Sequence, residues 1–429
     1  MEHKLLTEHY HRKSYSTLEG YKERGGYQTL RHALLKKPQE IVEEVKLSGL
    51  RGRGGAGFPT GVKWSFLPNN KEDRYLLCNA DEGEPGTFKD RMIMEKAPHQ
   101  LIEAMLISAY AIQAKKSYIY IRGEYQKAYL LLLKALEEAR IEGLIGKNIL
   151  DSSFSHEMDI YLGAGAYICG EETGMISSLE GKKGQPKLKP PFPAVQGYLG
   201  KPTIVNNVET LVAVIPIVKQ GAKAYRQIGT ERSPGTKIFS LSGDVLNPGN
   251  YELPLGYSLM DLIYDLGGGM RAGHSLKAVI PGGSSVPILT AKEAERTRLD
   301  YESLNELGTF LGSGGVIVLD DSRDMMDILS IILDFYHHES CGQCTPCREG
   351  TGWLSKLLKK VCKGMSSQRD WILIQKIAEN MQGRTICALS DAAAMPAISF
   401  MKKFRNEFEQ CLYENTNSSV KGVKESKHA

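Results

Sequence analysis

Three cysteines at C-x-x-C-x-x-C spacing, Cys341, Cys344 and Cys347, carry the strongest chemical signal in this sequence. Thiolates three residues apart in one loop can cover one face of an iron–sulfur cubane, each binding a different iron. Zinc, the alternative, is usually held by two separated C-x-x-C or histidine pairs. The spacing therefore favours a [4Fe–4S] cluster whose fourth ligand comes from another segment.

Three later cysteines compete for that fourth position. Cys362 falls on the apolar stripe of an amphipathic helix, which predicts a buried core thiol. Cys411 lies beside the polar C-terminal tail. Cys387 follows a glycine-containing break, where the backbone can adapt to a cluster and nearby amides can stabilise a thiolate. We therefore predict that Cys387 completes the cluster; His337 and His338 point apart on a helix and fit surface or packing roles better.

The amino-acid composition and charge argue against a disulfide-bonded secreted protein, a membrane-inserted protein and a nucleic-acid-binding protein. Eight cysteines in 429 residues fit ligands or buried thiols better than disulfides, because the first thirty residues are polar and have no apolar h-region. No apolar run reaches the roughly 18 residues of a membrane span, so we expect no membrane insertion. The net charge of +4 is too small to indicate a nucleic-acid partner.

Two glycine-rich loops are candidate sites for a phosphate or a flavin. Residues 52–57 match G-x-G-x-x-G, but a predicted helix precedes them, so the motif alone is weak evidence. Their exposed amides, flanked by Arg53 and Lys63, suit an anion or a flavin dipole. Residues 163–170 lead into a helix that begins with two glutamates. Those acids repel a phosphate and are better suited to accept hydrogen bonds from ribose hydroxyls or a carboxamide.

The elements that must position these residues alternate between strand and helix. Predicted strands lie at residues 75–79, 117–121 and 158–162, with helices at 99–112 and 126–142 between them. This order is typical of a layered α/β domain with a mostly parallel sheet, which binds ligands at the carboxyl ends of its strands. Asp81, Glu82 and Glu84 follow the first strand at such an end. Residues 1–30 are polar and predict a surface arm.

Six segments considered together resemble one family. They are GLRGRGGAGFPTG-x-KW (residues 49–64), NADEGEPGTFKDR (79–91), GAGAYICGEET (163–173), KPPFPA (189–194), NNVET (206–210) and ESCGQCTPCREG (339–350). In this order they resemble the NADH-binding flavoprotein subunit of respiratory NADH:quinone oxidoreductase (complex I). The resemblance implies an α/β Rossmann-like FMN-binding domain, an α+β ubiquitin-like (β-grasp) module and a C-terminal helical bundle that holds the cluster.

The same resemblance implies domain boundaries. They are an N-terminal arm, helix and glycine-rich loop (residues 1–60), the Rossmann-like FMN/NADH-binding domain (61–230), the β-grasp module (231–320), the helical bundle with its [4Fe–4S] cluster (321–412) and a tail expected to be disordered (413–429).

Site residues are carried over from the family motifs position by position. The implied FMN site comprises Gly52, Arg53, Gly54, Lys63, Asn79, Asp81, Glu82, Gly170, Glu171, Asn206 and Asn207. The implied NADH site comprises the rings of Phe58, Phe66 and Phe192 and the polar groups of Glu84, Glu172 and Lys189. The implied cluster ligands are Cys341, Cys344, Cys347 and Cys387; Cys78 and Cys169 match no ligand position and are expected to be structural.

The implied activity is NADH dehydrogenation, in which hydride passes to FMN and electrons leave singly through the cluster toward quinone. The implied partners are a small [2Fe–2S] thioredoxin-like subunit and a large iron–sulfur subunit. The implied place is the peripheral arm, on the cytoplasmic side of a bacterial plasma membrane or the matrix side in mitochondria. Flavoprotein subunits of NAD-linked hydrogenases and formate dehydrogenases share these motifs and are alternatives, as is a non-catalytic iron–sulfur scaffold whose β-grasp module binds a partner.

Overall fold

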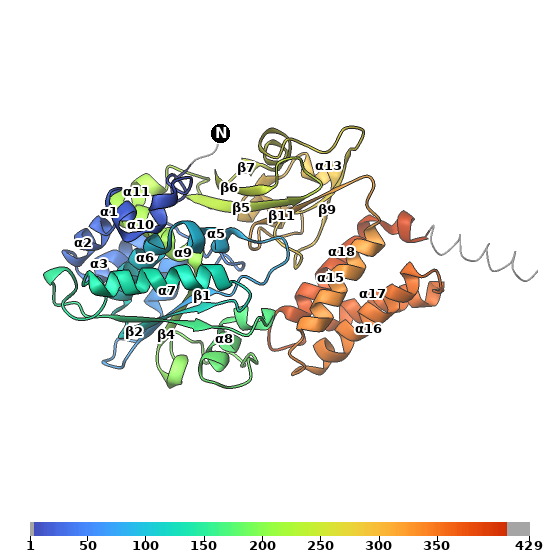
Figure 1. Cartoon of the computed structure of the whole chain (residues 1–429). Coiled ribbons are helices and arrows are strands. Elements are labelled where there is room, and N and C mark those ends of the chain that lie inside the picture. The colour runs from blue at the N-terminus through green and yellow to red at the C-terminus, as the bar shows by residue number, and fades with distance from the viewer. Residues whose placement is uncertain (1–3, 410–429) are drawn as a thin grey trace, which may run out of the picture.

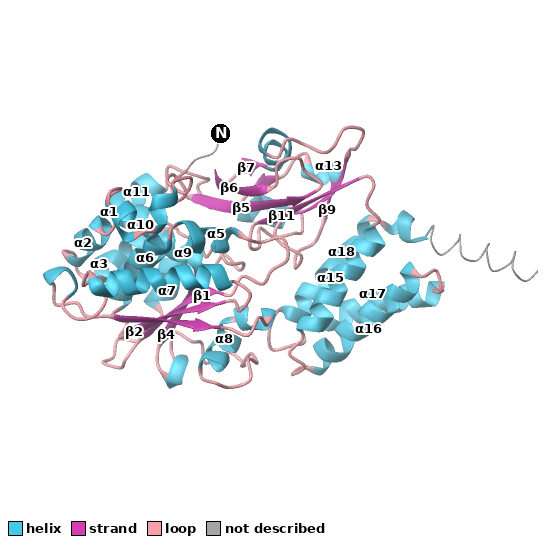
Figure 2. Cartoon of the chain, in the orientation of Figure 1, coloured by secondary structure: helices cyan, strands magenta, loops and turns pink. Residues whose placement is uncertain are grey.

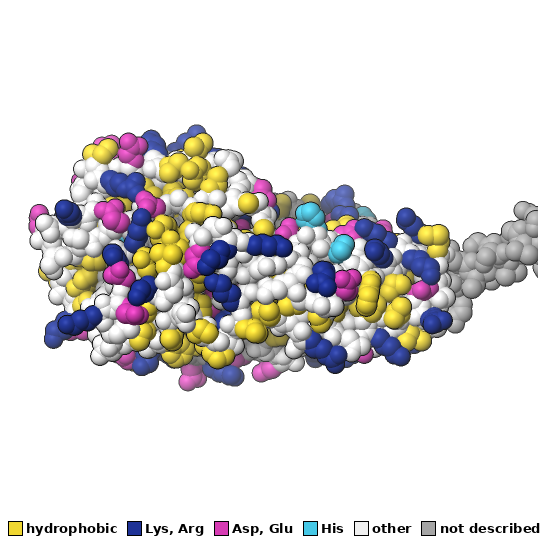
Figure 3. Space-filling view, turned by 90° about the horizontal axis from the view of Figure 1, so that it is seen from below, with side chains coloured by type: hydrophobic (Ala, Val, Ile, Leu, Met, Phe, Trp, Pro, Cys, Tyr) yellow, Lys and Arg dark blue, Asp and Glu magenta, His cyan; other side chains and the backbone are white. Residues whose placement is uncertain are grey.

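The computed structural model describes residues 4–409, so the predicted tail and Cys411 lie outside the described residues (Figure 1). An α/β domain, a mostly β module and a helical bundle lie side by side, and the bundle contacts the other two (Figure 1). Within the described residues, no helix is both long and apolar enough to cross a membrane. On the face shown in Figure 3, basic and acidic side chains are interspersed, as the small net charge suggests.

A four-stranded parallel sheet organises the α/β domain, in the order β3-β2-β1-β4. Its strands are β1 (Tyr75–Ala80), β2 (Lys116–Ile121), β3 (Glu157–Leu162) and β4 (Thr203–Asn207). The three predicted strands are confirmed, and β4, a short β-branched run, was not predicted. Because side chains alternate along a strand, Leu76 and Cys78 pack under α6 (Pro98–Ile112), whereas Leu77 faces α8 (Glu172–Leu179).

Helices cover both faces of this sheet (Figure 2). The face that holds α6 also carries α3 (Pro38–Leu47), α5 (Lys89–Lys96), α7 (Gln126–Ile141), α9 (Val208–Val212) and α10 (Val214–Gln220). Shorter helices are α4 (Thr60–Ser65), α11 (Ala222–Tyr225) and the 3₁₀ turns η2 (Ile149–Asp151), η3 (Tyr167–Gly170) and η4 (Tyr198–Gly200). The helix predicted at residues 99–112 is confirmed as α6. Almost all of its residues are buried, so α6 forms the centre of the domain.

The prediction of a surface arm at residues 1–30 is wrong for residues 4–30, which are the part of this segment that the structure describes. This segment forms η1 (Lys13–Ser16), α1 (Leu18–Lys22) and the start of α2 (Gln28–Leu34), and it buries four tyrosine rings against the domain. The carboxylate of Glu103 on α6 accepts hydrogen bonds from the amides of Tyr27 and Leu30, both at 2.9 Å, and from the Tyr21 hydroxyl. A tyrosine is polar in composition but buries a large ring once its hydroxyl has a partner.

The mostly β module contains a mixed five-stranded sheet, in the order β6-β5-β11-β8-β9. Its strands are β5 (Thr236–Gly243), β6 (Gly249–Pro254), β8 (Leu276–Ile280), β9 (Leu289–Thr290) and β11 (Gly315–Asp320). Only β5 and β11 pair in parallel among these strands. Smaller elements are β7 (Tyr257–Ser258), β10 (Arg298–Leu299), α12 (Leu259–Asp261), the π-turn η5 (Leu262–Leu266), α13 (Ala291–Ala294) and α14 (Tyr301–Glu306). The predicted α+β module is therefore confirmed.

The helical bundle consists of α15 (Met325–Glu339), α16 (Thr345–Cys362), α17 (Gln368–Met381) and α18 (Leu389–Lys403). Leu333, Leu354 and Ile374, one from each of three helices, are fully buried in its core. The expectation that Cys362 is a buried core thiol is wrong: it is the last residue of α16 and is exposed. The apolar stripe extends through Val361, and the end of the helix leaves its final residue exposed.

Candidate functional site

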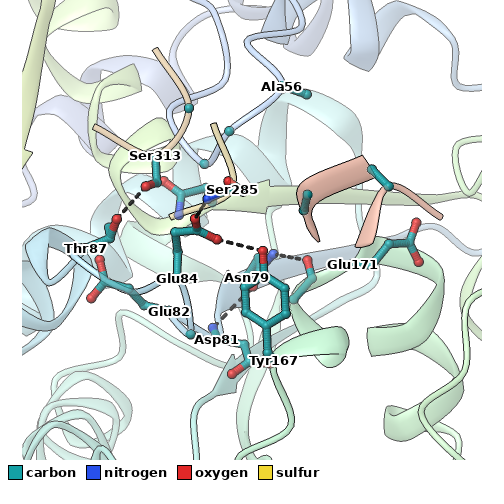
Figure 4. A pocket seen from close by; sticks show the side chains of 18 of the residues that line it. Ala56, Asn79, Asp81, Glu82, Glu84, Thr87, Tyr167, Glu171, Ser285 and Ser313 are labelled. Carbon is teal, nitrogen blue, oxygen red and sulfur yellow. Dashed lines mark hydrogen bonds between the residues drawn. The ribbon is translucent and has the colours of Figure 1, made fainter. Parts of the chain in front are cut away.

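A cavity of about 420 Å³ opens where the three parts of the chain meet (Figure 4). This volume lies within the roughly 300–1,000 Å³ typical of ligand sites. Its walls come from the first glycine loop, the segment after β1, the second glycine loop, two loops of the β module and the start of α18. The lining includes Gly54, Ala56, Asn79, Asp81, Glu84, Tyr167, Gly170, Glu171, Asn207, Ser285, Ser313, Cys387 and Leu389.

Two glycines let backbone come close at this cavity. A Cβ on Gly54 would lie 2.9 Å from the Cβ of Asn207, and one on Gly83 would lie 3.1 Å from the ring of Tyr167. Both separations are shorter than ordinary carbon–carbon contacts of about 3.5–4.0 Å. The absence of side chains at these two positions thus lets Asn207 and Tyr167 pack directly against the backbone of the cavity wall.

Asp81 offers an unused acceptor to the cavity. Its side chain is largely buried, and its Oδ2 has no hydrogen-bond partner among the described residues. Burial raises the pKa of Asp81 to about 7, although Arg122 opposes the shift. A buried polar atom without a partner is costly unless a ligand supplies one. This orphaned oxygen, with the glycine-lined wall, fits the polar groups of FMN.

Glu84 faces the cavity from the same segment and is already hydrogen-bonded (Figure 4). The Tyr167 hydroxyl donates to its Oε2 at 2.6 Å, and the Ser285 amide donates to its Oε1 at 2.8 Å. Burial nevertheless raises the pKa of Glu84. Both hydrogen bonds come from neutral groups, in contrast to the ammonium partners of Glu172 described below. The bond from Ser285 links the α/β domain to the β module.

Glu82 has a different role, although it lies between these two acids. Its carboxylate accepts from the amides of Asp90 and Arg91, at 2.8 and 3.0 Å, at the first turn of α5. Burial is the main cause that raises the pKa of Glu82 to about 7. The side chain therefore holds α5 in place.

The structure brings seven of the eleven predicted FMN residues to the cavity wall, namely Gly54, Asn79, Asp81, Glu82, Gly170, Glu171 and Asn207. Gly52, Arg53, Lys63 and Asn206 lie outside that lining. The Arg53 guanidinium is fully buried and donates to the Tyr225 hydroxyl and the Pro234 carbonyl. Asn206 accepts from the indole N–H of Trp64 at 2.8 Å. These two side chains hold the glycine loop and α4 against the rest of the domain.

The predicted NADH residues lie outside the lining of the cavity, except for Glu84. Glu172 binds the ammonium groups of Lys63 at 2.8 Å and Lys189 at 3.0 Å. These two cations lower the pKa of Glu172 against the effect of burial, which acts in the opposite direction. The rings of Phe58, Phe66 and Phe192 are about half exposed, and the first two have centroids 5.9 Å apart.

Several lining residues were missed by the sequence analysis. Tyr167, Lys89 and Asp90 lie inside recognised segments, so their positions were available although their roles were not. Ser285 and Ser313 come from loops of the β module, for which the sequence carries no signal at all.

The predicted cluster cysteines occupy two neighbouring segments. Cys341 and Cys344 lie in the loop between α15 and α16, Cys347 lies in the first turn of α16, and Cys387 lies in the loop before α18. The two loops touch, because the amide of Ile386 donates to the sulfur of Cys344 at 3.4 Å. Burial first, and then the thiols of Cys341 and Cys347, raise the pKa of Cys387 to about 11. A set of free thiols from two adjoining loops fits a [4Fe–4S] cluster.

Known families match each of the three parts. The Nuo51 FMN-binding domain matches residues 45–216, the SLBB domain matches residues 237–318, and the NADH-ubiquinone oxidoreductase-F iron-sulfur binding region matches residues 327–411. An F subunit of NADH-quinone oxidoreductase in Rhizobium meliloti is 53% identical over 91% of this chain and 93% of its own length. The chain belongs to the family of NADH-quinone oxidoreductase F subunits.

Other relatives support this assignment. The corresponding F subunit in Rickettsia massiliae is 49% identical over 95% of this chain and 97% of its own length. An NAD⁺-reducing [NiFe]-hydrogenase in the H₂-reduced state matches with a TM-score of 0.82 and 40% identity, over 90% of this chain. The present chain spans 64% of that hydrogenase chain. The expected family, FMN and [4Fe–4S] cofactors and NADH substrate are confirmed for this member of the F-subunit family.

Replacing Cys387 tests the fourth cluster ligand. We expect Cys387→Ser to abolish or convert the EPR signal of the reduced four-iron cluster while FMN content stays unchanged, because the predicted FMN residues all lie in the α/β domain. Cys362→Ser is the matched control and should keep the signal, since Cys362 is exposed at the end of α16. An unchanged spectrum in Cys387→Ser would remove Cys387 from the ligand set.

The raised pKa of Asp81 predicts a pH-dependent stability. Between its ordinary value of 3.8 and about 7 the folded chain holds a proton that the unfolded chain has lost, so stability falls as pH rises. The limiting slope is about 1.4 kcal/mol per pH unit. In flavin-depleted protein, Asp81→Asn should raise the melting temperature more at pH 8 than at pH 5. Asp151→Asn, at an exposed position, is the control; an equal gain at both pH values would contradict the assignment.

Proposed function

We propose that this member of the F-subunit family oxidises NADH in the cavity and passes electrons one at a time to a [4Fe–4S] cluster on Cys341, Cys344, Cys347 and Cys387. The observation that carries the proposal is that Cys387 and Asn79 line the same cavity. A flavin held there would have Cys387, one of the proposed cluster ligands, in the wall of its own site. When bound, FMN supplies the conversion of two-electron hydride chemistry into single-electron transfer.

The described contacts divide the predicted FMN residues into two groups. Gly54, Asn79, Asp81, Gly170, Glu171 and Asn207 are proposed to contact FMN directly, because they line the cavity. Gly52, Arg53, Lys63 and Asn206 are proposed to position that wall, because their side-chain or backbone contacts hold neighbouring elements. Glu82 is assigned to this second group although it lines the cavity, because its carboxylate accepts from the amides of α5. No residue needs to act as a strong acid or base, since hydride transfer requires alignment of the donor and acceptor.

The residues that contact NADH are proposed to lie at the rim of the cavity. The exposed rings of Phe58, Phe66 and Phe192 supply flat apolar surface on which a base or nicotinamide can stack. Glu84, Glu172 and Lys189 supply acceptors and a donor for polar groups of the dinucleotide. Of the two acids, Glu172 is neutralised by two ammonium groups, whereas Glu84 accepts from the hydroxyl of Tyr167.

The architecture also supports finer proposals. The order β6-β5-β11-β8-β9, with β5 and β11 adjacent and parallel, is compatible with a β-grasp module at residues 231–320. The proposed boundaries are residues 61–230 for the flavin-binding domain and residues 321–412 for the helical bundle that holds the cluster. The peripheral arm of complex I, on the cytoplasmic or matrix side, is the proposed place of this chain.

Ferricyanide reduction tests the proposed activity. We expect NADH to bleach the flavin absorbance and to drive ferricyanide reduction only when FMN is bound. Apoprotein prepared without FMN, and then reconstituted, provides the matched comparison. Equal rates with and without FMN would refute the flavin-dependent reaction. No rate in the reconstituted protein would favour a non-catalytic scaffold.

Glu84 is expected to discriminate against NADPH. A desolvated carboxylate near the nucleotide repels a 2′-phosphate, and such like-charge contacts cost several kcal/mol. Glu84→Gln should therefore raise the NADPH to NADH ratio of kcat/KM by about tenfold or more. Glu172→Gln should change the ratio less, because Lys63 and Lys189 already balance that charge. An unchanged ratio in Glu84→Gln would contradict the proposed role.

Partners are proposed to include a small [2Fe–2S] thioredoxin-like subunit and a large iron–sulfur subunit. Within the described residues no helix can cross a membrane, so electrons need further carriers to reach quinone. Native purification from gently lysed cells should recover both subunits with this chain. Recovery of a [NiFe] hydrogenase instead would favour the second candidate, which the 40% identity to an NAD⁺-reducing hydrogenase supports. A stable isolated monomer would contradict both.

A further inference from the structure

A separate group of potential metal ligands lies outside the flavin cavity. His274 is in the loop before β8, Asp320 ends β11 and Asp321 follows it. One ligand atom from each of these residues lies within 4.8 Å of the other two. The group therefore joins a loop of the β module to the segment that leads into α15.

Two of the three separations between the donor atoms bracket the value for a tetrahedral metal site. Nδ1 of His274 lies 2.8 Å from Oδ1 of Asp321 and 3.8 Å from Oδ2 of Asp320. Zinc bonds of about 2.0–2.1 Å at tetrahedral angles place neighbouring donor atoms about 3.3 Å apart. The two observed separations lie on either side of this value, so modest side-chain adjustments would seat an ion.

Asp320 supplies a second, independent indication. Its side chain is fully buried, and its Oδ1 accepts from the amide and the hydroxyl of Ser322, at 3.0 and 2.5 Å. Its Oδ2, the atom nearest His274, has no hydrogen-bond partner among the described residues. A fully buried carboxylate oxygen is normally paired, hydrogen-bonded or bound to a metal. The orphaned oxygen thus faces the place where a cation would lie.

The surroundings orient the other carboxylate and leave the group negative. Oδ2 of Asp321 accepts from the amide and hydroxyl of Ser275, at 3.1 and 2.8 Å, which leaves its Oδ1 directed to His274. Such outer contacts fix the orientation of metal ligands. The nearby guanidinium of Arg323 forms a two-point ion pair with Asp244, so its charge is already matched.

We propose that His274, Asp320 and Asp321 bind one divalent transition-metal ion of the zinc class, with water as a fourth ligand. An imidazole nitrogen with two carboxylates suits zinc, whereas calcium and magnesium prefer oxygen ligands alone. The bound ion fastens the loop before β8 to the start of the connection into α15. Because α15 ends at the cysteine loop, the ion stabilises the joint between the β module and the cluster bundle.

Metal analysis of the flavin- and cluster-loaded protein tests this site. After incubation with zinc sulfate and desalting, wild-type chain should retain stoichiometric zinc with its iron content unchanged, and zinc should raise its melting temperature. His274→Gln and Asp321→Asn should lose both effects. His11→Asn and Asp265→Asn, substitutions of an exposed histidine and an exposed aspartate, should keep both. Flavin absorbance confirms that each variant is folded.

Three outcomes would overturn the proposal. Wild-type protein that retains no zinc would show that the three side chains form only a hydrogen-bonded group. Zinc that rises while iron falls would place the metal on the cluster cysteines. Equal zinc in His274→Gln and wild type would place it elsewhere. None of these readouts uses NADH oxidation, so failure here is distinct from failure of the proposed activity.

Discussion

The placement of the β module against the α/β domain depends on the ion pairs and the hydrogen bond of one buried carboxylate, that of Glu209. It lies at the start of α9 and is completely buried. Its Oε2 contacts the ammonium groups of Lys89 at 2.9 Å and Lys237 at 3.3 Å, and its Oε1 accepts from the Ile238 amide at 2.7 Å. These three residues come from α5 and from β5 of the β module. A buried charge is tolerated only when paired and hydrogen-bonded, so both elements are held in place.

The same network reaches the wall of the cavity proposed to bind the flavin. Lys237 donates to the carbonyl of Arg53 at 3.0 Å, in the first glycine loop. Asp90 accepts from the side-chain amide of Asn207 at 2.6 Å, and both residues line the cavity. Burial lowers the pKa of Lys237 to about 7, whereas Lys237 and Lys89 lower the pKa of Glu209 against the effect of burial. The charges that join the module to the sheet thus also support the cavity.

The cavity in turn explains why three structural units are needed. The α/β domain supplies Asn79 and the glycine loops, the β module supplies Ser285, and the bundle supplies Cys387. Ser285 also holds Glu84, while the Tyr167 amide donates to Glu339 at the end of α15. Each unit therefore contributes both to the wall of the cavity and to the contacts that hold the other units in position. This arrangement would bring a hydride acceptor bound in the cavity close to Cys387, one of the proposed ligands of the single-electron carrier.

Local patterns in the sequence were sufficient for three strands of the parallel sheet, the helices between them and the segments that carry the cysteines and glycines. Periodicity and residue type act over a few residues, so such features can be predicted without a fold. The two wrong predictions, for residues 1–30 and for Cys362, concern features that depend on tertiary contacts or on where a helix ends. The tyrosines of residues 1–30 are buried because Glu103 and neighbouring groups satisfy their polar atoms, and Cys362 is exposed because α16 ends there.

What the sequence by itself determined was the set of chemical groups: thiols at cluster spacing, glycine loops, and acids after a strand. Only the tertiary structure decided that Glu82 caps a helix while Asp81 keeps a free oxygen, although the two are adjacent in the chain. It also decided that Arg53 supports the loop from behind and that Ser285 joins the cavity. Those outcomes depend on partners from distant segments of the chain, and burial and hydrogen bonding with such partners have no local signature in the sequence.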